Sequence, residues 1–295
     1  MQRVTKDQLC TSFSALNPPA LRVQPGEVFI METNDRFAVY DGPDSSPEAM
    51  DILKTMAGPV YIEGAKPGDT LKIAILDVTL PLHYGWIGAT PGRGPLGQRI
   101  ATFRKTRVQI TRDGVIFNDR ISLPVRPMIG RIGLAPQDGP LPSVAKGVFG
   151  GGMGNTQIGK GATVYLPVFH AGGLLTIGDC HAAMGDGEVT ASAVECAVDA
   201  TLQVTIDTRF TVRRPVVETA SEIMTTGEGQ SMEEATAVAV QGMADLLMAQ
   251  LDIDDTDAAM LIASAADVRT GIAGHAPYTM RVAVPKSVLS WQRDL

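Results

Sequence analysis

The 295-residue chain has few charged residues, few cysteines and no long apolar run. Charged residues make up 19% of it, below the roughly 25% of an average soluble protein. The net charge is −7, and no cluster of Lys and Arg occurs, which argues against nucleic acid or an anionic membrane as a partner. The three cysteines contain no CxxC pair, which argues against a disulfide framework. We therefore expect a reducing, cytoplasmic location.

Segments that target or anchor a protein are also missing from the sequence pattern. Residues 1–21 lack the apolar stretch of a signal peptide. No window approaches the roughly 18 uninterrupted apolar residues of a membrane-spanning helix, since the stretch at 161–177 is broken by Pro167 and His170. We therefore expect a soluble protein with no membrane partner.

Glycine and proline, with 31 and 19 residues, are by contrast frequent. From Pro18 to about Phe210, short runs of Val, Ile, Leu and Thr alternate with Pro-Gly, Asp-Gly and Gly-Gly steps, a pattern typical of strands joined by tight turns. Residues 25–35 and 67–77 both show a Pro-Gly turn, an alternating strand and a closing Asp. This similarity predicts two like strands in one sandwich or barrel.

Helical periodicity occurs only late in the chain. Ser231 and Glu234 have the spacing of a capping box, and apolar residues follow at helical intervals to Leu247. A second helix is predicted from Asp254 or Asp255 towards Ala266. We predict a mainly β fold of sandwich-like or barrel-like sheets with α-helices inserted near the C-terminus, α+β overall. A single domain would span 1–295, with a β-rich part at 1–215, a helical insertion at about 230–268 and a final strand at about 279–289.

The segment from Thr176 to Val189 is the richest in reactive side chains. It holds Asp179, His181, Asp186 and Glu188 among small residues. Carboxylates and one imidazole on a flexible backbone are ligands suited to zinc or a similar divalent ion. Asp-Gly and Gly-Asp steps also occur in ordinary turns, so a structural role stays open for them.

The sequence GDCHAAMGDGEV at 178–189 resembles the central motif of the acetamidase/formamidase family, metal-dependent hydrolases of short amides. Other segments are similar to this family in the same order along the chain. They lie at 17–19, 25–27, 32–35, 58–65, 67–69, 126–136, 161–168 and 264–269.

The resemblance implies an amidohydrolase that cleaves the C–N bond of a formamide-like or acetamide-like carboxamide to a carboxylate and ammonia. A metal-activated water would attack the carbonyl. By position, Glu32, His181 and Asp186 are the implied metal ligands, and Asp186 or Glu188 would transfer the proton. Zinc is the expected ion, and calcium is left open as a second one. By analogy with the family, a homodimer or homotetramer is expected.

Three further acids are kept as alternative or supporting ligands, namely Asp35, Asp179 and Glu188. Since Glu32 and Asp35 are three residues apart, a regular strand would direct them to opposite faces. At least one of these two carboxylates is therefore expected to be structural.

The sequence departs from the family pattern in one glycine-rich segment. Many relatives there read approximately Gly-Pro-His-Gly-Gly-Asn-Met-Asp, but the His, Asn and Asp positions fall here on Phe149, Gly152 and Gly154. Two alternatives to the short-amide reaction follow: hydrolysis of a cyclic or larger amide, or a non-catalytic relative that binds a metal or ligand. The candidate substrate contacts are Phe149, Gly151, Asn155 and Trp86.

Overall fold

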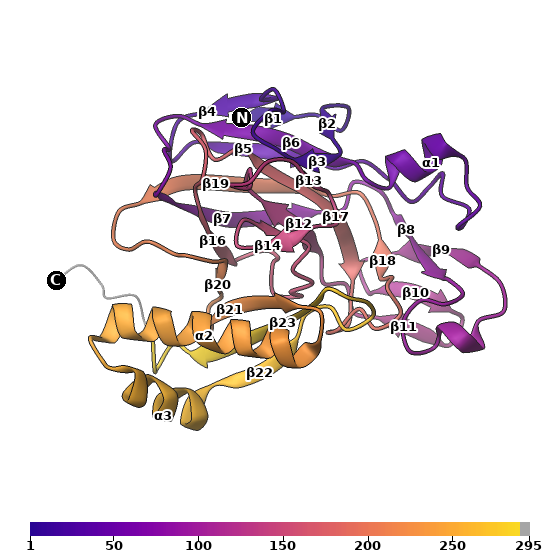
Figure 1. The fold of residues 1–295 in the computed structure, drawn as a ribbon. Coiled ribbons are helices and arrows are strands. Elements are labelled where there is room, and N and C mark those ends of the chain that lie inside the picture. Colours follow the sequence, from indigo (N-terminus) through magenta and orange to yellow (C-terminus); the bar gives the residue numbers. More distant parts are fainter. Residues whose placement is uncertain (290–295) are drawn as a thin grey trace.

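Two large β-sheets form most of the molecule (Figure 1), for which a computed structural model describes residues 1–289. The first sheet has nine strands in the order β1-β5-β19-β7-β16-β20-β21-β23-β22. Its strands are β1 (Gln2–Val4), β5 (Val28–Glu32), β7 (Thr70–Thr79), β16 (Thr163–Pro167), β19 (Asp199–Asp207), β20 (Val216–Glu218), β21 (Glu222–Gly229), β22 (Asp267–Thr270) and β23 (Tyr278–Pro285).

The second sheet follows the order β11-β10-β9-β8-β18-β17-β12-β15-β14, and β6 joins β17 to β2 and β4. Its strands are β2 (Leu9–Cys10), β4 (Leu21–Val23), β6 (Met56–Ile62), β8 (Tyr84–Ala89), β9 (Arg104–Ile110), β10 (Val115–Asn118), β11 (Ile121–Leu123), β12 (Met128–Gly133), β14 (Lys146–Gly147), β15 (Gly150–Gly151), β17 (Leu175–Ala183) and β18 (Val194–Glu195). A small separate sheet pairs β3 (Ser12–Phe13) with β13 (Leu141–Pro142).

The two large sheets share one apolar core. Alternate residues of β7 and β19 point into it, among them Ile73 and Leu202, and the same apolar cluster contains Ile129 of β12 and Ile177 of β17. Face-to-face burial of this kind is what a β-sandwich requires. The two similar strands predicted from 25–35 and 67–77 are β5 and β7, which flank β19 in the same sheet.

Two late helices, α2 (Met232–Leu251) and α3 (Asp255–Ala265), cover the other face of this sheet around β21 and β23 (Figure 1). Because side chains alternate along a strand, Ile223 packs with Leu247 of α2 while the next residue, Met224, belongs to the main core. The predicted cap of α2 is present, since Glu234 N–H donates to Ser231 Oγ at 3.0 Å. The predicted fold class is thereby confirmed.

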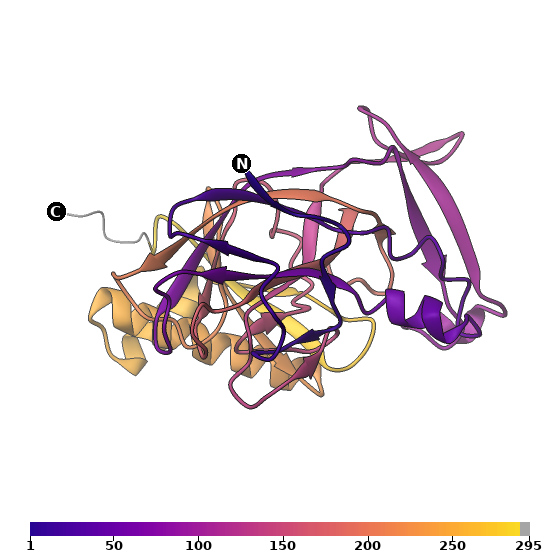
Figure 2. The ribbon, with the colours of Figure 1, turned by 90° about the horizontal axis from the view of Figure 1, so that it is seen from above.

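Two shorter helical segments, α1 (Pro47–Ile52) and η1 (Gly97–Arg99), lie in the part of the chain predicted to be β-rich. The strands β8, β9 and β10 project from one end of the molecule (Figure 2). Within residues 1–289, no helix has both the length and the apolarity needed to cross a membrane.

Candidate active site

Three ionisable side chains converge on one face of the second sheet. Asp179 and His181 are two residues apart on β17, and His181 lies directly opposite Glu195 of β18 in the antiparallel ladder. Residues that are two apart on a strand, or directly paired across strands, share a face. One oxygen or nitrogen atom from each of the three side chains lies within 4.8 Å of the others. The local strand pairing therefore assembles two carboxylates and an imidazole.

His181 is enclosed, and its ring makes no hydrogen bond with the part of the chain that the structure describes. Its side chain is 1% exposed, and Nε2 lies 3.4 Å from Asp179 Oδ1 and 3.5 Å from Glu195 Oε2. Neither ring nitrogen has a hydrogen-bond partner among the described residues. Buried polar atoms in folded proteins nearly always have a hydrogen-bond partner. The position of Nε2 beside two carboxylates therefore suits an atom that coordinates a metal ion.

Two arginines neutralise the carboxylates of this cluster. Arg36 Nη2 lies 3.1 Å from Glu195 Oε2 and also contacts Asp179 Oδ1. Arg131 Nε lies 3.0 Å from Asp179 Oδ2. Arg36 thus touches the same two carboxylate oxygens that face His181 Nε2. The guanidinium of Arg36 therefore lies beside the position that a metal ion would occupy.

Nearby residues keep the pKa of Glu195 low despite its burial. Burial alone would raise this pKa, but the electrostatic effects of His181 and Arg36 outweigh it and hold the pKa well below its usual range. Burial, assisted by the charge of Arg36, lowers the pKa of Arg131 to about 9. The Glu195 carboxylate is therefore available as an anionic ligand near neutral pH.

The backbone at Asp179 has a left-handed conformation, with φ of +53°, in the middle of β17. The ladder pairs Ile129 with Cys180 and Arg131 with Gly178, so Gly130 stands beside the irregular residue. A Cβ at position 130 would lie 2.1 Å from the Asp179 carbonyl oxygen and 3.1 Å from His181 Cε1. Glycine at position 130 lets β12 lie close to the distorted part of β17. A left-handed backbone at a residue such as Asp179 is often found at functional sites.

A cavity of about 600 Å³ opens onto this cluster. Asp179, Glu188 and Glu195 lie on its wall, as does His275. Burial, and to a smaller extent the charge of Glu195, raises the pKa of Glu188 against the opposing effect of His181. Five cationic side chains also line the cavity: Arg36, Lys54, Arg93, Arg131 and Lys146.

Two residues predicted as ligands lie outside the cluster. Glu32, at the end of β5, contacts the guanidinium of Arg3 and accepts a hydrogen bond from the Lys6 backbone. Asp186 accepts from Thr156 Oγ1 at 2.6 Å and pairs with Arg281 Nη2 at 2.5 Å. Each carboxylate already has a cationic partner, and the roles assigned to Glu32 and Asp186 stay predictions.

The remaining predicted residues have varied surroundings. Asp35 Oδ2 accepts from Trp86 Nε1 at 3.2 Å, while its buried Oδ1 has no hydrogen-bond partner within the described residues. Phe149 packs on Phe13 in a small apolar cluster. The amide of Asn155 accepts a hydrogen bond from the Gln157 backbone at 3.0 Å. None of Trp86, Phe149, Gly151 and Asn155 lines the cavity. The substrate contacts assigned to these four residues from the sequence stay predictions.

The departures from the family pattern differ in their consequences. Gly154 has φ of +61°, and a Cβ there would lie 2.4 Å from Ile272 Cγ1, so no side chain fits without a shift. Gly152 lies on the cavity wall, and a Cβ there would meet no atom closer than 3.8 Å. Only the glycine at 152 leaves space open towards the cavity.

Sequence reasoning missed Glu195, Arg36 and Arg131. Glu195 is the single charged residue between Ala191 and Val198, and Arg131 is the single one in the buried strand β12. A lone charge within an apolar strand signals a buried ion pair or a site, because charged residues are seldom fully buried without partners. Arg36, in a loop after Asp35, has no comparable signal.

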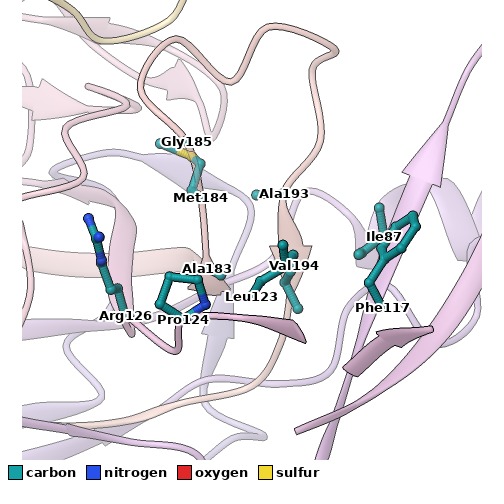
Figure 3. A pocket seen from close by; sticks show the side chains of 10 residues that line it. All are labelled: Ile87, Phe117, Leu123, Pro124, Arg126, Ala183, Met184, Gly185, Ala193 and Val194. Carbon is teal, nitrogen blue, oxygen red and sulfur yellow. The ribbon is translucent and has the colours of Figure 1, made fainter. Parts of the chain in front are cut away.

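A second hollow of about 460 Å³ lies beyond the end of β17 (Figure 3). Apolar side chains form most of its wall, including Ile87, Phe117 and Val194, and among residues 1–289 only Arg126 adds a charge to the lining. The described residues place no carboxylate, imidazole or thiol on its wall.

The chain was compared with protein-family profiles, with curated proteins and with solved structures, and all three comparisons found similar proteins. The profile of the Acetamidase/Formamidase family matches residues 13–146 and 143–289. The structure is similar to that of a predicted acetamidase/formamidase from Thermoanaerobacter tengcongensis, with TM-score 0.92, 33% identity and coverage of 98% of this chain and 96% of that one. For an acetamidase from Bacillus halodurans the TM-score is 0.89, with 31% identity and 97% coverage of both chains.

A formamidase from Methylophilus methylotrophus is 24% identical over 245 residues, covering 61% of this chain and 59% of that protein. The chain thus matches less than two thirds of the length of this relative.

Proposed function

Because the chain belongs to the acetamidase/formamidase family, we propose that it is an amidase that hydrolyses a small carboxamide to a carboxylate and ammonia. The observation that carries the proposal is His181, whose buried, unpartnered Nε2 faces two carboxylates at the wall of a cavity. The names of the relatives, acetamidase and formamidase, support linear amides as the substrate class.

We assign Asp179, His181 and Glu195 as the residues that hold a divalent cation, in place of the set with Glu32 and Asp186. Two carboxylate oxygens and one imidazole nitrogen equal in number the three protein ligands of catalytic zinc sites, and zinc accepts both kinds of ligand, so we keep zinc as the proposed ion. Coordination would also give His181 Nε2 the partner that it lacks. Since Arg36 Nη2 touches the same carboxylates, binding of the cation requires this guanidinium to turn aside.

An amide is a difficult substrate because resonance weakens its carbonyl as an electrophile and its nitrogen as a leaving group. When bound, a divalent cation supplies Lewis acidity at the carbonyl and lowers the pKa of water. Glu188, on the cavity wall with a raised pKa, can take a proton from the attacking water and return it to the departing nitrogen. Arg131 fixes the Asp179 carboxylate through the 3.0 Å contact.

Arg131, and Arg36 once its guanidinium has turned from the two carboxylates, can also act on the substrate. Negative charge develops on the carbonyl oxygen as the water adds, and cationic donors in a site shielded from water stabilise such charge strongly. Both guanidinium groups line the cavity beside the cluster, with side chains that are 11% and 9% exposed.

The homodimer or homotetramer and the cytoplasmic location expected from the sequence are kept as parts of the proposal.

Ammonia release tests the reaction. The protein is stripped with a chelator, reloaded with zinc, and assayed with formamide, acetamide, propionamide and a cyclic lactam. We expect the stripped protein to be inactive and zinc to restore ammonia release from at least one linear amide. Activity on the lactam alone would favour a cyclic substrate. No activity on any of them, with zinc bound, would contradict the proposal and favour a non-catalytic binding role.

A further inference from the structure

The cavity is larger than a short amide requires. Acetamide has only four non-hydrogen atoms, whereas pockets of roughly 300–1,000 Å³ accommodate drug-sized ligands. The cavity of about 600 Å³ lies well within that range. A substrate that fills it must carry a further group besides the amide.

The charges on the wall indicate the sign of that group. Five cationic side chains face three carboxylates, and Arg36 and Arg131 are paired with Asp179 and Glu195. Lys146 and Arg93 have no carboxylate within 4 Å among residues 1–289; Lys146 Nζ donates only to the Pro277 carbonyl, at 2.9 Å. The fifth cation, Lys54, pairs with Asp51 at 2.8 Å. Lys146 and Arg93 are therefore the lining cations without a carboxylate at ion-pair distance among the described residues, and the charge of Glu188 acts on Lys146 only from farther away.

The surroundings of Lys146 make an incoming anion favourable. Burial, together with the charge of Arg131, lowers the pKa of Lys146 to about 8 in spite of the charge of Glu188. Burial and the charges of Lys146, Arg93 and Arg131 lower the pKa of His275 on the same wall. Cations that disfavour one another in a partly buried cavity are stabilised by an added negative charge.

We propose that the enzyme selects carboxamides that carry a second, anionic group, such as the monoamide of a dicarboxylic acid. The amide would face Asp179, His181 and Glu195, and the carboxylate would bind Lys146 with Arg93 nearby. This inference rests on the proposed amidase function and specifies its substrate class.

The first test compares succinamate with 4-methylpentanamide, a neutral amide of matched shape, on the zinc-loaded enzyme. A hydrogen bond to a charged group contributes about 1.5–3 kcal/mol, so we expect a preference in kcat/KM of about 10-fold to 100-fold for succinamate. Lys146→Met should lower this ratio at least about tenfold. The control Lys160→Met removes an exposed lysine that pairs with Asp77 outside the cavity, and should leave the ratio unchanged.

The second test measures succinate binding by calorimetry and needs no turnover. We expect succinate to bind and Lys146→Met to weaken it about tenfold, with Lys160→Met unchanged. If succinate binds in this way but no amide is hydrolysed, the anion site stands and the amidase function fails. The inference would be overturned if both amides had equal kcat/KM, or if Lys146→Met changed neither the kcat/KM ratio nor the succinate affinity. Either result would leave the amidase function intact.

Discussion

The groups that each carboxylate contacts, more than its position in a motif, distinguish the acidic residues of the site from those with a structural role. Asp179 and Glu195 face an imidazole that lacks a hydrogen bond. Asp186 instead pairs at 2.5 Å with Arg281, whose side chain is 1% exposed, and so connects the segment after β17 to β23. The geometry therefore favours a structural role for Asp186, although it belongs to the central motif.

Replacement of Asp186 by Asn should destabilise the fold near neutral pH. The variant leaves the buried Arg281 charge without its anion, and a buried donor that loses its partner costs about 1–3 kcal/mol. Burial would raise the pKa of Asp186, but hydrogen bonds from Thr156 and Arg281 outweigh it and lower that pKa. Urea unfolding at several pH values measures the loss.

The pH dependence of this loss has a definite sign. A carboxyl group with a depressed folded-state pKa stabilises the fold above its unfolded pKa, about 3.9, and loses that effect as pH falls through the folded value. The difference between wild type and Asp186→Asn should thus be full at about pH 7 and shrink below about pH 4. The control is Asp77→Asn, which breaks an exposed pair with Lys160 and should change stability by less than about 1 kcal/mol. A loss that grows in acid would contradict the account.

At the scale of elements, the site depends on the distortion of β17 against β12. Gly130→Ala would place a methyl group 2.1 Å from the Asp179 carbonyl oxygen, a backbone atom that cannot move without shifting the strand. We expect a loss of about 1–3 kcal/mol in unfolding free energy and at least about tenfold weaker zinc binding. Gly152→Ala is the matched control, since its methyl group meets nothing within 3.8 Å. Equal zinc affinities in the two variants would show that the distortion is irrelevant.

Strand pairing also explains which part of the site could be predicted. Asp179 and His181 are two residues apart, so the sequence alone places them on one face of a strand. Glu195 joins them only through the pairing of β17 with β18, and its position opposite His181 depends on a bulge between His181 and Ala183. Such a register is not local, and a lone Glu in an apolar run does not specify its partner.

For the whole molecule, the mainly β architecture and the late helices follow from local patterns. The Pro-Gly turns that lead into β5 and β7 and the cap at Ser231 are encoded within a few residues. By contrast, β19 pairs with both β5 and β7 from more than a hundred residues further on, and these distant contacts bring the loop with Arg36 to β17 and β18. Periodicity carries no information on contacts at such separation.

The measurement that tests the central claim most directly is a zinc titration of the chelator-stripped protein in three forms. We predict that the wild type binds zinc and that Glu195→Gln weakens binding by more than about 100-fold, beyond the loss typical of residues that only support a ligand. Glu32→Gln, the same chemical change at a carboxylate paired with Arg3, should bind zinc like the wild type. Weakened binding in Glu32→Gln together with wild-type affinity in Glu195→Gln would contradict the assignment of Asp179, His181 and Glu195 as the metal site.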